Sequence, residues 1–196
     1  MAAIPLSATP LGDLTIRIAR PSALLAALVV SASVAGTTST YTDQATRDIK
    51  ALSAAEIADL LAGKGMGYAK AAELNGYPGP AHVLELAQEL HLSARQRAES
   101  QAIFENMTDS AKRTGADLIR AERELEFAFR NRRVTPNLLT RTLREIAILD
   151  GQLRGVHLQA HLDQTQVLTP RQIARYAALR GYDNAAGDPT HEHDAP

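Results

Sequence analysis

Two short stretches decide the fold: Leu168-Thr169-Pro170-Arg171-Gln172 and its earlier copy Leu92-Ser93-Ala94-Arg95-Gln96. Both read L-[ST]-x-x-Q, and they begin 76 residues apart. The hydroxyl of the second residue can accept a hydrogen bond from a free backbone N–H of a first helical turn. The glutamine three residues later can bond back to the N–H of the cap, which closes a capping box. Each copy therefore predicts the start of a helix.

The same pattern of capping residues predicts the other helices. Ser53 and Glu56 predict a short helix that runs to Ala62, and Gly63 follows it as a natural terminator. Thr135 before a proline predicts another start, and apolar spacing predicts a short helix from Ala81 to Leu90. The helix that begins after Thr169 is expected to end near Arg180, before Gly181.

Heptad spacing predicts that the two longest helices pack along their length. The first runs from Ser93 to about Asn131 and the second from Thr135 to about Thr165, with a tight turn between them. The first carries small and apolar residues at two heptad positions: Phe104, Ala111, Leu118 and Leu125 at one, Met107, Thr114, Ala121 and Ala128 at the other. The second carries the stripe Ile146, Leu149, Leu153, Val156 and Ala160. So short a turn makes the helices antiparallel neighbours.

Composition agrees with an all-α chain and excludes several classes of protein. The chain has 196 residues, 4% aromatic residues, no tryptophan and no cysteine. The absence of cysteine excludes disulfides, thiolate metal sites and cysteine nucleophiles. A net charge of −1 gives no global field toward nucleic acid or an anionic membrane, so no nucleic-acid partner is expected.

The sequence divides into four segments. Residues 1–35 read as a secretory signal, with Arg17 and Arg20 before a short apolar run and Ser33-Val34-Ala35 as a cleavage site; the alternative is an uncleaved anchor, the one case in which a membrane is expected. Residues 36–77 form a flexible lead-in and a short helical arm, and residues 78–182 the helical domain. Residues 183–196 are polar and are expected to be disordered.

These features resemble the Spy/CpxP family of LTxxQ-motif periplasmic proteins and, more distantly, the CnrX-type periplasmic heavy-metal sensors. The resemblance rests on the two L-[ST]-x-x-Q motifs, which bracket a long hairpin behind a signal peptide, and it covers residues 78–182. The first copy departs from the family pattern because Ser93 replaces threonine. The resemblance implies a bent four-helix subunit, a homodimer and a periplasmic location.

The resemblance also implies that unfolded clients or an envelope-stress signalling partner bind a mixed basic and apolar face, without ATP. The arginines of the first long helix can supply this client-binding face, as Arg113, Arg120, Arg123 and Arg130. The alternative is an ordinary solvated helix face with i,i+4 ion pairs such as Asp109–Arg113 and Glu126–Arg130.

Histidines suggest a second function, metal sensing or buffering. His157 and His161 lie at i,i+4 on one helix face, a spacing that can chelate one ion. The CnrX-type sensors use His and Glu on early helices together with a late i,i+4 pair, and this likeness adds His82 and Glu85 as candidate ligands of Zn, Ni, Co or Cu. The alternative is that these histidines only pack and hydrogen-bond at an interface. The tail His191-Glu192-His193-Asp194 is a weaker metal signal.

Enzymatic function is not expected. Neither G-x-S-x-G nor H-E-x-x-H occurs, and no strand–turn–helix element is predicted that could hold a nucleophile on a strained turn. We therefore assign no catalytic residue.

Overall fold

The computed structural model describes residues 41–182, and all regular structure within them is helical. The elements are η1 (Thr42–Gln44), α1 (Ala54–Ala62), α2 (Lys70–Glu73), α3 (Pro80–Glu85), α4 (Ala94–Arg130), α5 (Pro136–Val167) and α6 (Pro170–Arg180). The predicted secretory signal and the His191-Glu192-His193-Asp194 tail lie outside the described residues. No helix between residues 41 and 182 combines the length and apolarity that a bilayer crossing requires.

The predicted helix starts are confirmed. Ser53, Ser93 and Thr169 each accept a hydrogen bond from the backbone N–H three residues later and receive the reciprocal bond of a full capping box. Thr135 caps α5 through the N–H of Leu138. Gly63 and Gly181 end α1 and α6 in the left-handed conformation. Local residue chemistry therefore fixes where the helices begin and end.

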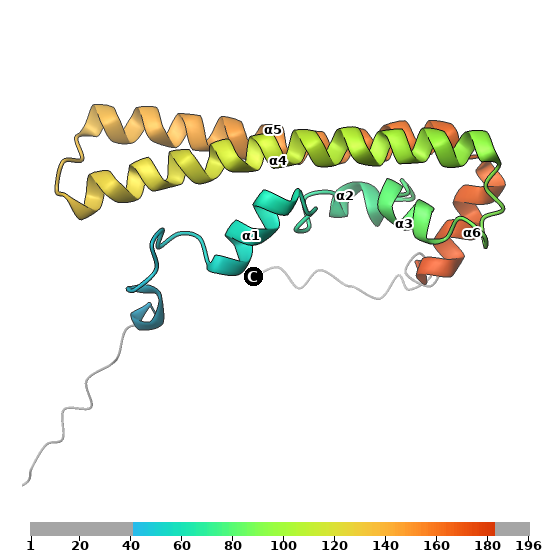
Figure 1. Cartoon of the computed structure of the whole chain (residues 1–196), viewed down its shortest axis with the longest axis horizontal. Coiled ribbons are helices and arrows are strands. Elements are labelled where there is room, and N and C mark those ends of the chain that lie inside the picture. Colours follow the sequence, from blue (N-terminus) through green and yellow to red (C-terminus); the bar gives the residue numbers. More distant parts are fainter. Residues whose placement is uncertain (1–40, 183–196) are drawn as a thin grey trace, which may run out of the picture. The chain divides into compact units, whose positions relative to one another are not determined.

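The predicted antiparallel hairpin is the α4–α5 pair (Figure 1). Its turn, between Arg130 and Pro136, places Arg132 at a φ of +53°. The heptad positions lie at or near the interface: Ala111, Leu118, Ala121, Ala128, Leu153 and Ala160 are buried, and Phe104, Met107, Thr114, Leu125, Ile146, Leu149 and Val156 are partly buried. Small side chains at the buried positions let the two helices approach closely.

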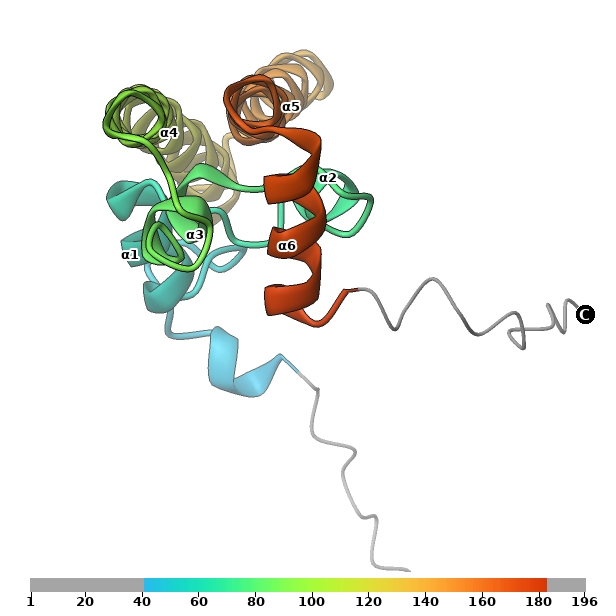
Figure 2. The same ribbon diagram turned by 90° about the vertical axis from the view of Figure 1, so that its right-hand side faces the viewer.

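The short helices cover one side of this hairpin (Figures 1 and 2). Helix α1 packs on α4, and α3 packs on α4 and α5. Ile49 and Leu60 of the N-terminal arm share a core cluster with Ala111, Leu118, Ile119 and Leu153. At the other end, Val83 joins Leu168 and Tyr176 in a second cluster. The arm therefore contributes to the core of the molecule.

Helix α3 is shorter than predicted. Apolar spacing predicted a helix to Leu90, but the regular helix ends at Glu85 and turns follow. His91 has a φ of +51°, and the N–H of Leu92 bonds to the carbonyl of Ala87. The chain reverses here to enter α4, and this reversal overrides the local helical pattern. Helices η1 and α2 were not predicted.

The two L-[ST]-x-x-Q motifs are joined through their glutamines. The Gln96 amide donates to Gln172 Oε1 at 2.8 Å, and the Gln172 amide donates to Gln96 Oε1 at 3.1 Å. The same amides also donate to the carbonyls of Val167 and Leu90, respectively, at 3.0 and 3.1 Å. Each glutamine therefore serves its own capping box and the opposite motif at once.

Candidate functional site

The four residues predicted as metal ligands line one cavity. His82 and Glu85 reach it from α3, and His157 and His161 reach it from α5. The cavity measures about 490 Å³, and its wall also includes Phe104, Met107 and Thr108 of α4 and residues between 62 and 81. Two elements far apart in the sequence therefore bring the predicted residues to the same hollow.

His157 is a buried imidazole at the wall of this cavity. Its ring stacks on Tyr68 with centroids 6.0 Å apart and an interplanar angle of 3°. Burial, and secondarily the charge of His161, lowers the pKa of His157. Its Nε2 is buried and has no hydrogen-bond partner within the described residues. This nitrogen is therefore a free polar atom at the cavity wall.

His161 has its ring orientation set by the backbone. Its Nδ1 lies 2.7 Å from the carbonyl oxygen of Tyr77. Because a carbonyl can only accept, Nδ1 must carry the proton, and in the neutral ring Nε2 then keeps its lone pair. Histidines that ligate metals commonly have this kind of outer bond.

His82 and Glu85 pair with each other. His82 Nδ1 lies 2.8 Å from Glu85 Oε2, and both side chains reach solvent. Among residues 41–182, no three His, Asp or Glu side chains converge in a way that would hold a metal ion. The donor types suit a transition metal, but the side chains occupy separate contacts instead of a common centre.

Glu73 is a site residue that the sequence did not reveal. Its carboxylate accepts hydrogen bonds from Tyr176 at 2.5 Å and Tyr182 at 3.0 Å, and its Oε2 lies 3.6 Å from His161 Nδ1. That oxygen is buried without a hydrogen bond, and burial together with the bond to Glu73 raises the pKa of Tyr176. Glu73 sits on the unpredicted α2, so no local pattern could have placed it beside His161.

The arginines of the predicted client-binding face have several partners. Arg113 bonds to Ser110 at 3.1 Å instead of the expected Asp109, and Arg120 pairs with Asp117 at 2.8 Å. The expected Glu126–Arg130 pair is present at 3.4 Å.

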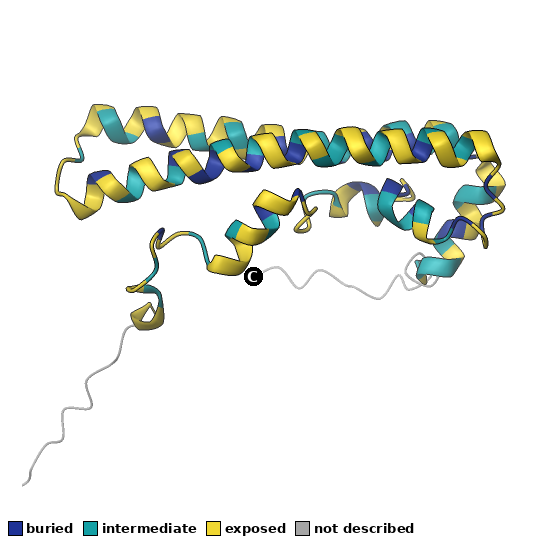
Figure 3. Ribbon diagram, in the orientation of Figure 1, coloured by how far each residue is buried: buried dark blue, intermediate teal, exposed yellow. Residues whose placement is uncertain are grey.

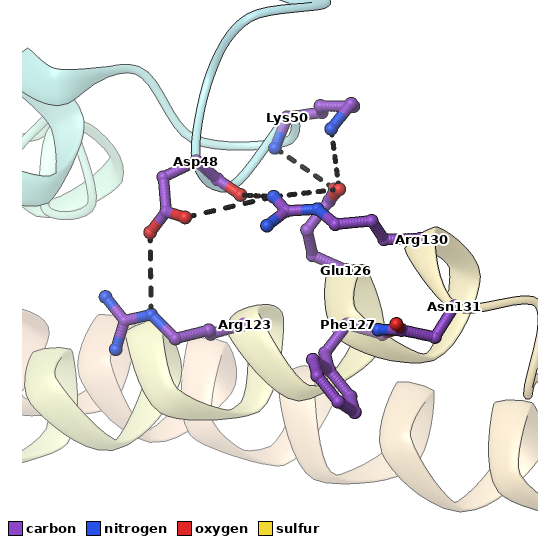
Figure 4. A network of polar contacts seen from close by, with 7 residues as sticks. All are labelled: Asp48, Lys50, Arg123, Glu126, Phe127, Arg130 and Asn131. Atoms are coloured by element: carbon purple, nitrogen blue, oxygen red, sulfur yellow. Dashed lines mark hydrogen bonds and ion pairs between the residues drawn. The ribbon is translucent and has the colours of Figure 1, made fainter.

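The N-terminal arm forms polar contacts with two of these arginines (Figure 4). Asp48 lies 3.7 Å from Arg123 and 3.8 Å from Arg130, and Arg130 also donates to the carbonyl of Asp48. Lys50 pairs with Glu126 at 2.7 Å and lowers the pKa of that carboxyl group. These contacts flank the buried Ile49 and hold the arm on α4.

A hollow with an apolar floor lies near the hairpin turn. It measures about 450 Å³, with Phe127, Ala128 and Leu138 as its apolar lining, and it is bordered by Arg120, Arg123, Glu124 and Arg133. Phe127 is 57% exposed, and with the exposed Phe129 it interrupts the largely polar solvent side of α4. The arrangement combines exposed aromatic surface with arginines, whose stems extend the apolar area.

Comparison with known proteins adds no assignment, since no protein family, no curated protein and no solved structure matches the chain.

Proposed function

We propose that the chain is a periplasmic, ATP-independent binding protein of the chaperone or envelope-stress-modulator kind. It acts as a homodimer and holds unfolded or partner proteins on the arginine-bearing side of α4. The observation that carries this proposal is the hollow in which the exposed Phe127 and the half-buried Leu138 lie between Arg120, Arg123 and Arg133. Unfolded segments present mixed apolar and acidic groups, and such a surface offers contacts to both.

The arm fits this function as a neighbour of the binding surface. Asp48 satisfies part of the charge of Arg123 and Arg130, but the pairs are long and the Asp48 side chain is 70% exposed. Ion pairs of this kind contribute little stability. A client carboxylate can therefore replace Asp48 at little cost, while Ile49 keeps the arm anchored.

Phe127→Ser is expected to weaken client binding. Mature protein should suppress aggregation of a chemically unfolded client at near-stoichiometric ratios, and Phe127→Ser should need several times more protein for the same effect. Loss of the exposed ring removes roughly 1–2 kcal/mol of apolar contact to a client. Light scattering of the diluted client measures the effect.

Leu74→Ser is the matched control, because Leu74 is 62% exposed and lies away from the hollow. It should suppress aggregation as well as the unmodified protein does. Absence of suppression with several clients would refute the function, and equal weakening by both variants would refute the surface.

Metal binding is the second candidate function. Its support is the single cavity shared by His82, Glu85, His157 and His161, with an unpartnered Nε2 on His157. A bound Zn, Ni, Co or Cu ion would supply the missing partner for that nitrogen. Since no three His, Asp or Glu side chains of residues 41–182 converge on a common centre, binding would require these side chains to move.

His157→Phe/His161→Phe is expected to abolish tight metal binding if this cavity is the site. Phenylalanine retains the ring that stacks on Tyr68 and removes the ligand nitrogens. Calorimetry with each of the four metals measures affinity, and both proteins should carry His191→Ala and His193→Ala to remove binding by the tail. Unchanged affinity in the double phenylalanine variant would exclude this cavity as the metal site.

A further inference from the structure

The end of the hairpin carries a local charge that the net charge of the chain hides. Residues 127–144 hold five arginines and no aspartate or glutamate. Because the whole chain carries −1, the remaining residues together carry −6. The charge of the molecule is therefore strongly separated along the sequence, with its positive part at the α4–α5 turn.

Four of these arginines are available to a partner. Arg130 is engaged by Asp48 and Glu126. The side chains of Arg132, Arg133, Arg141 and Arg144 are exposed, and none has an ion pair with another residue of the 41–182 segment. Arg132 and Arg133 come from the turn, and Arg141 and Arg144 lie three residues apart on one face of α5, so two elements contribute the four charges.

Apolar side chains are exposed among these arginines. Phe129 is 53% exposed and Leu143 is 47% exposed, and the hairpin end is largely solvent-accessible (Figure 3). A second hollow lies along α5, and its lining includes Arg141, Arg144, Glu145 and Ile148. Large apolar groups beside unpaired guanidinium groups mark an interaction surface.

We propose that this end, formed by Phe129, Leu143 and the four unpaired arginines, docks onto an anionic phospholipid surface. Guanidinium groups bind phosphate oxygens in a bidentate manner, and phenylalanine and leucine enter the boundary between headgroups and acyl chains. Several unpaired guanidinium groups with exposed apolar side chains among them complement a dense array of phosphates above an apolar layer. The inference does not depend on client binding, although Arg133 also borders the client-binding hollow.

The test is co-sedimentation with lipid vesicles. Protein should bind vesicles in which phosphatidylglycerol is about a third of the lipid, and should not bind vesicles of phosphatidylcholine alone. Each arginine near an anionic surface contributes about fivefold to partitioning. Replacing all four unpaired arginines with glutamine should therefore reduce binding on the order of a hundredfold or more, and high salt should do the same.

A matched control separates the hairpin end from net charge. Arg97, Arg154, Arg171 and Arg175 are also exposed and without an ion pair to the rest of residues 41–182, and their replacement with glutamine changes the charge equally. This control variant should keep most of the binding. The proposal is overturned if the unmodified protein does not bind phosphatidylglycerol vesicles, or if both variants lose binding equally.

Two further measurements keep the outcomes distinct. Binding of the hairpin end to polyglutamate but not to vesicles would assign it to an acidic protein and would overturn the lipid proposal. A variant with glutamine only at Arg132, Arg141 and Arg144 keeps Arg133 of the client-binding hollow, and it should suppress aggregation normally in lipid-free solution. Failure of vesicle binding with normal suppression would overturn the lipid proposal and leave the proposed function intact.

Discussion

Replacing both motif glutamines with alanine should destabilise the protein by less than the sum of the two single replacements. Gln172→Ala removes the reciprocal bond of one capping box, both bonds to Gln96, and the bond to the carbonyl of Leu90. Because partly buried groups are left unpaired, we expect each single replacement to cost about 2–3 kcal/mol. In the double variant neither glutamine is left facing an empty position, so we expect a coupling energy of about 1 kcal/mol.

Urea unfolding of the unmodified protein, the two single variants and the double variant forms a double-mutant cycle, which gives the coupling energy directly. Thr169→Ala tests the cap alone, since it leaves the glutamine pair in place, and should cost about 0.5–2 kcal/mol. Gln101→Ala is the matched control, because its amide bonds only to the exposed Glu105 on the same helix, and its cost should stay within about 0.5 kcal/mol. Additive costs for Gln96 and Gln172 would mean that the motifs act as two independent caps.

This pairing marks the limit of what the sequence could predict about the fold. A capping box involves residues three positions apart, so Ser93 with Gln96 and Thr169 with Gln172 were readable locally and are confirmed. The Gln96–Gln172 pair joins residues 76 positions apart, and either amide would satisfy its own box without the other. Spacing in the sequence therefore could not predict that the two glutamines also bond to each other.

The candidate site shows the same division. The i,i+4 spacing of His157 and His161 predicts that they share a helix face, and the resemblance to metal sensors added His82 and Glu85; all four do line one cavity. The sequence could not predict that a backbone carbonyl holds His161 or that Tyr68 covers His157, because both partners come from the arm. Glu73 was not predicted as a site residue, because it lies on a four-residue helix, which is too short to produce a recognisable sequence pattern.

Gly115→Ala should destabilise the protein, although alanine is the better helix former. A Cβ at position 115 would lie 2.7 Å from the carbonyl oxygen of Leu60 and 3.1 Å from its carbon. These are backbone atoms of α1, so α1 must move away from α4. Overpacking of this kind costs about 1–3 kcal/mol or more, against a gain of about 1 kcal/mol in helix propensity. We expect a net loss of about 1–2 kcal/mol, and a larger loss for Gly115→Val.

Gly151→Ala is the matched control, because it makes the same chemical change in the interior of the other long helix. A Cβ at position 151 would meet nothing within 4 Å, so only the propensity term remains and stability should rise by about 0.5–1 kcal/mol. Opposite signs for the two variants in urea unfolding would demonstrate close packing of α1 on α4. A stabilising Gly115→Ala would contradict it.

Amide hydrogen exchange then shows which helices lose protection in Gly115→Ala. Leu60 and Ile49 are almost fully buried, and they belong to the core because the arm packs on α4. Displacement of α1 should therefore speed exchange of the amides of α1, while those of α6, whose Tyr176 belongs to the second core cluster, keep their protection. Since Asp48 and Lys50 flank Ile49, the same displacement should also release Arg123 and Glu126. The packing of one glycine thus determines whether the arm lies against the proposed client-binding face.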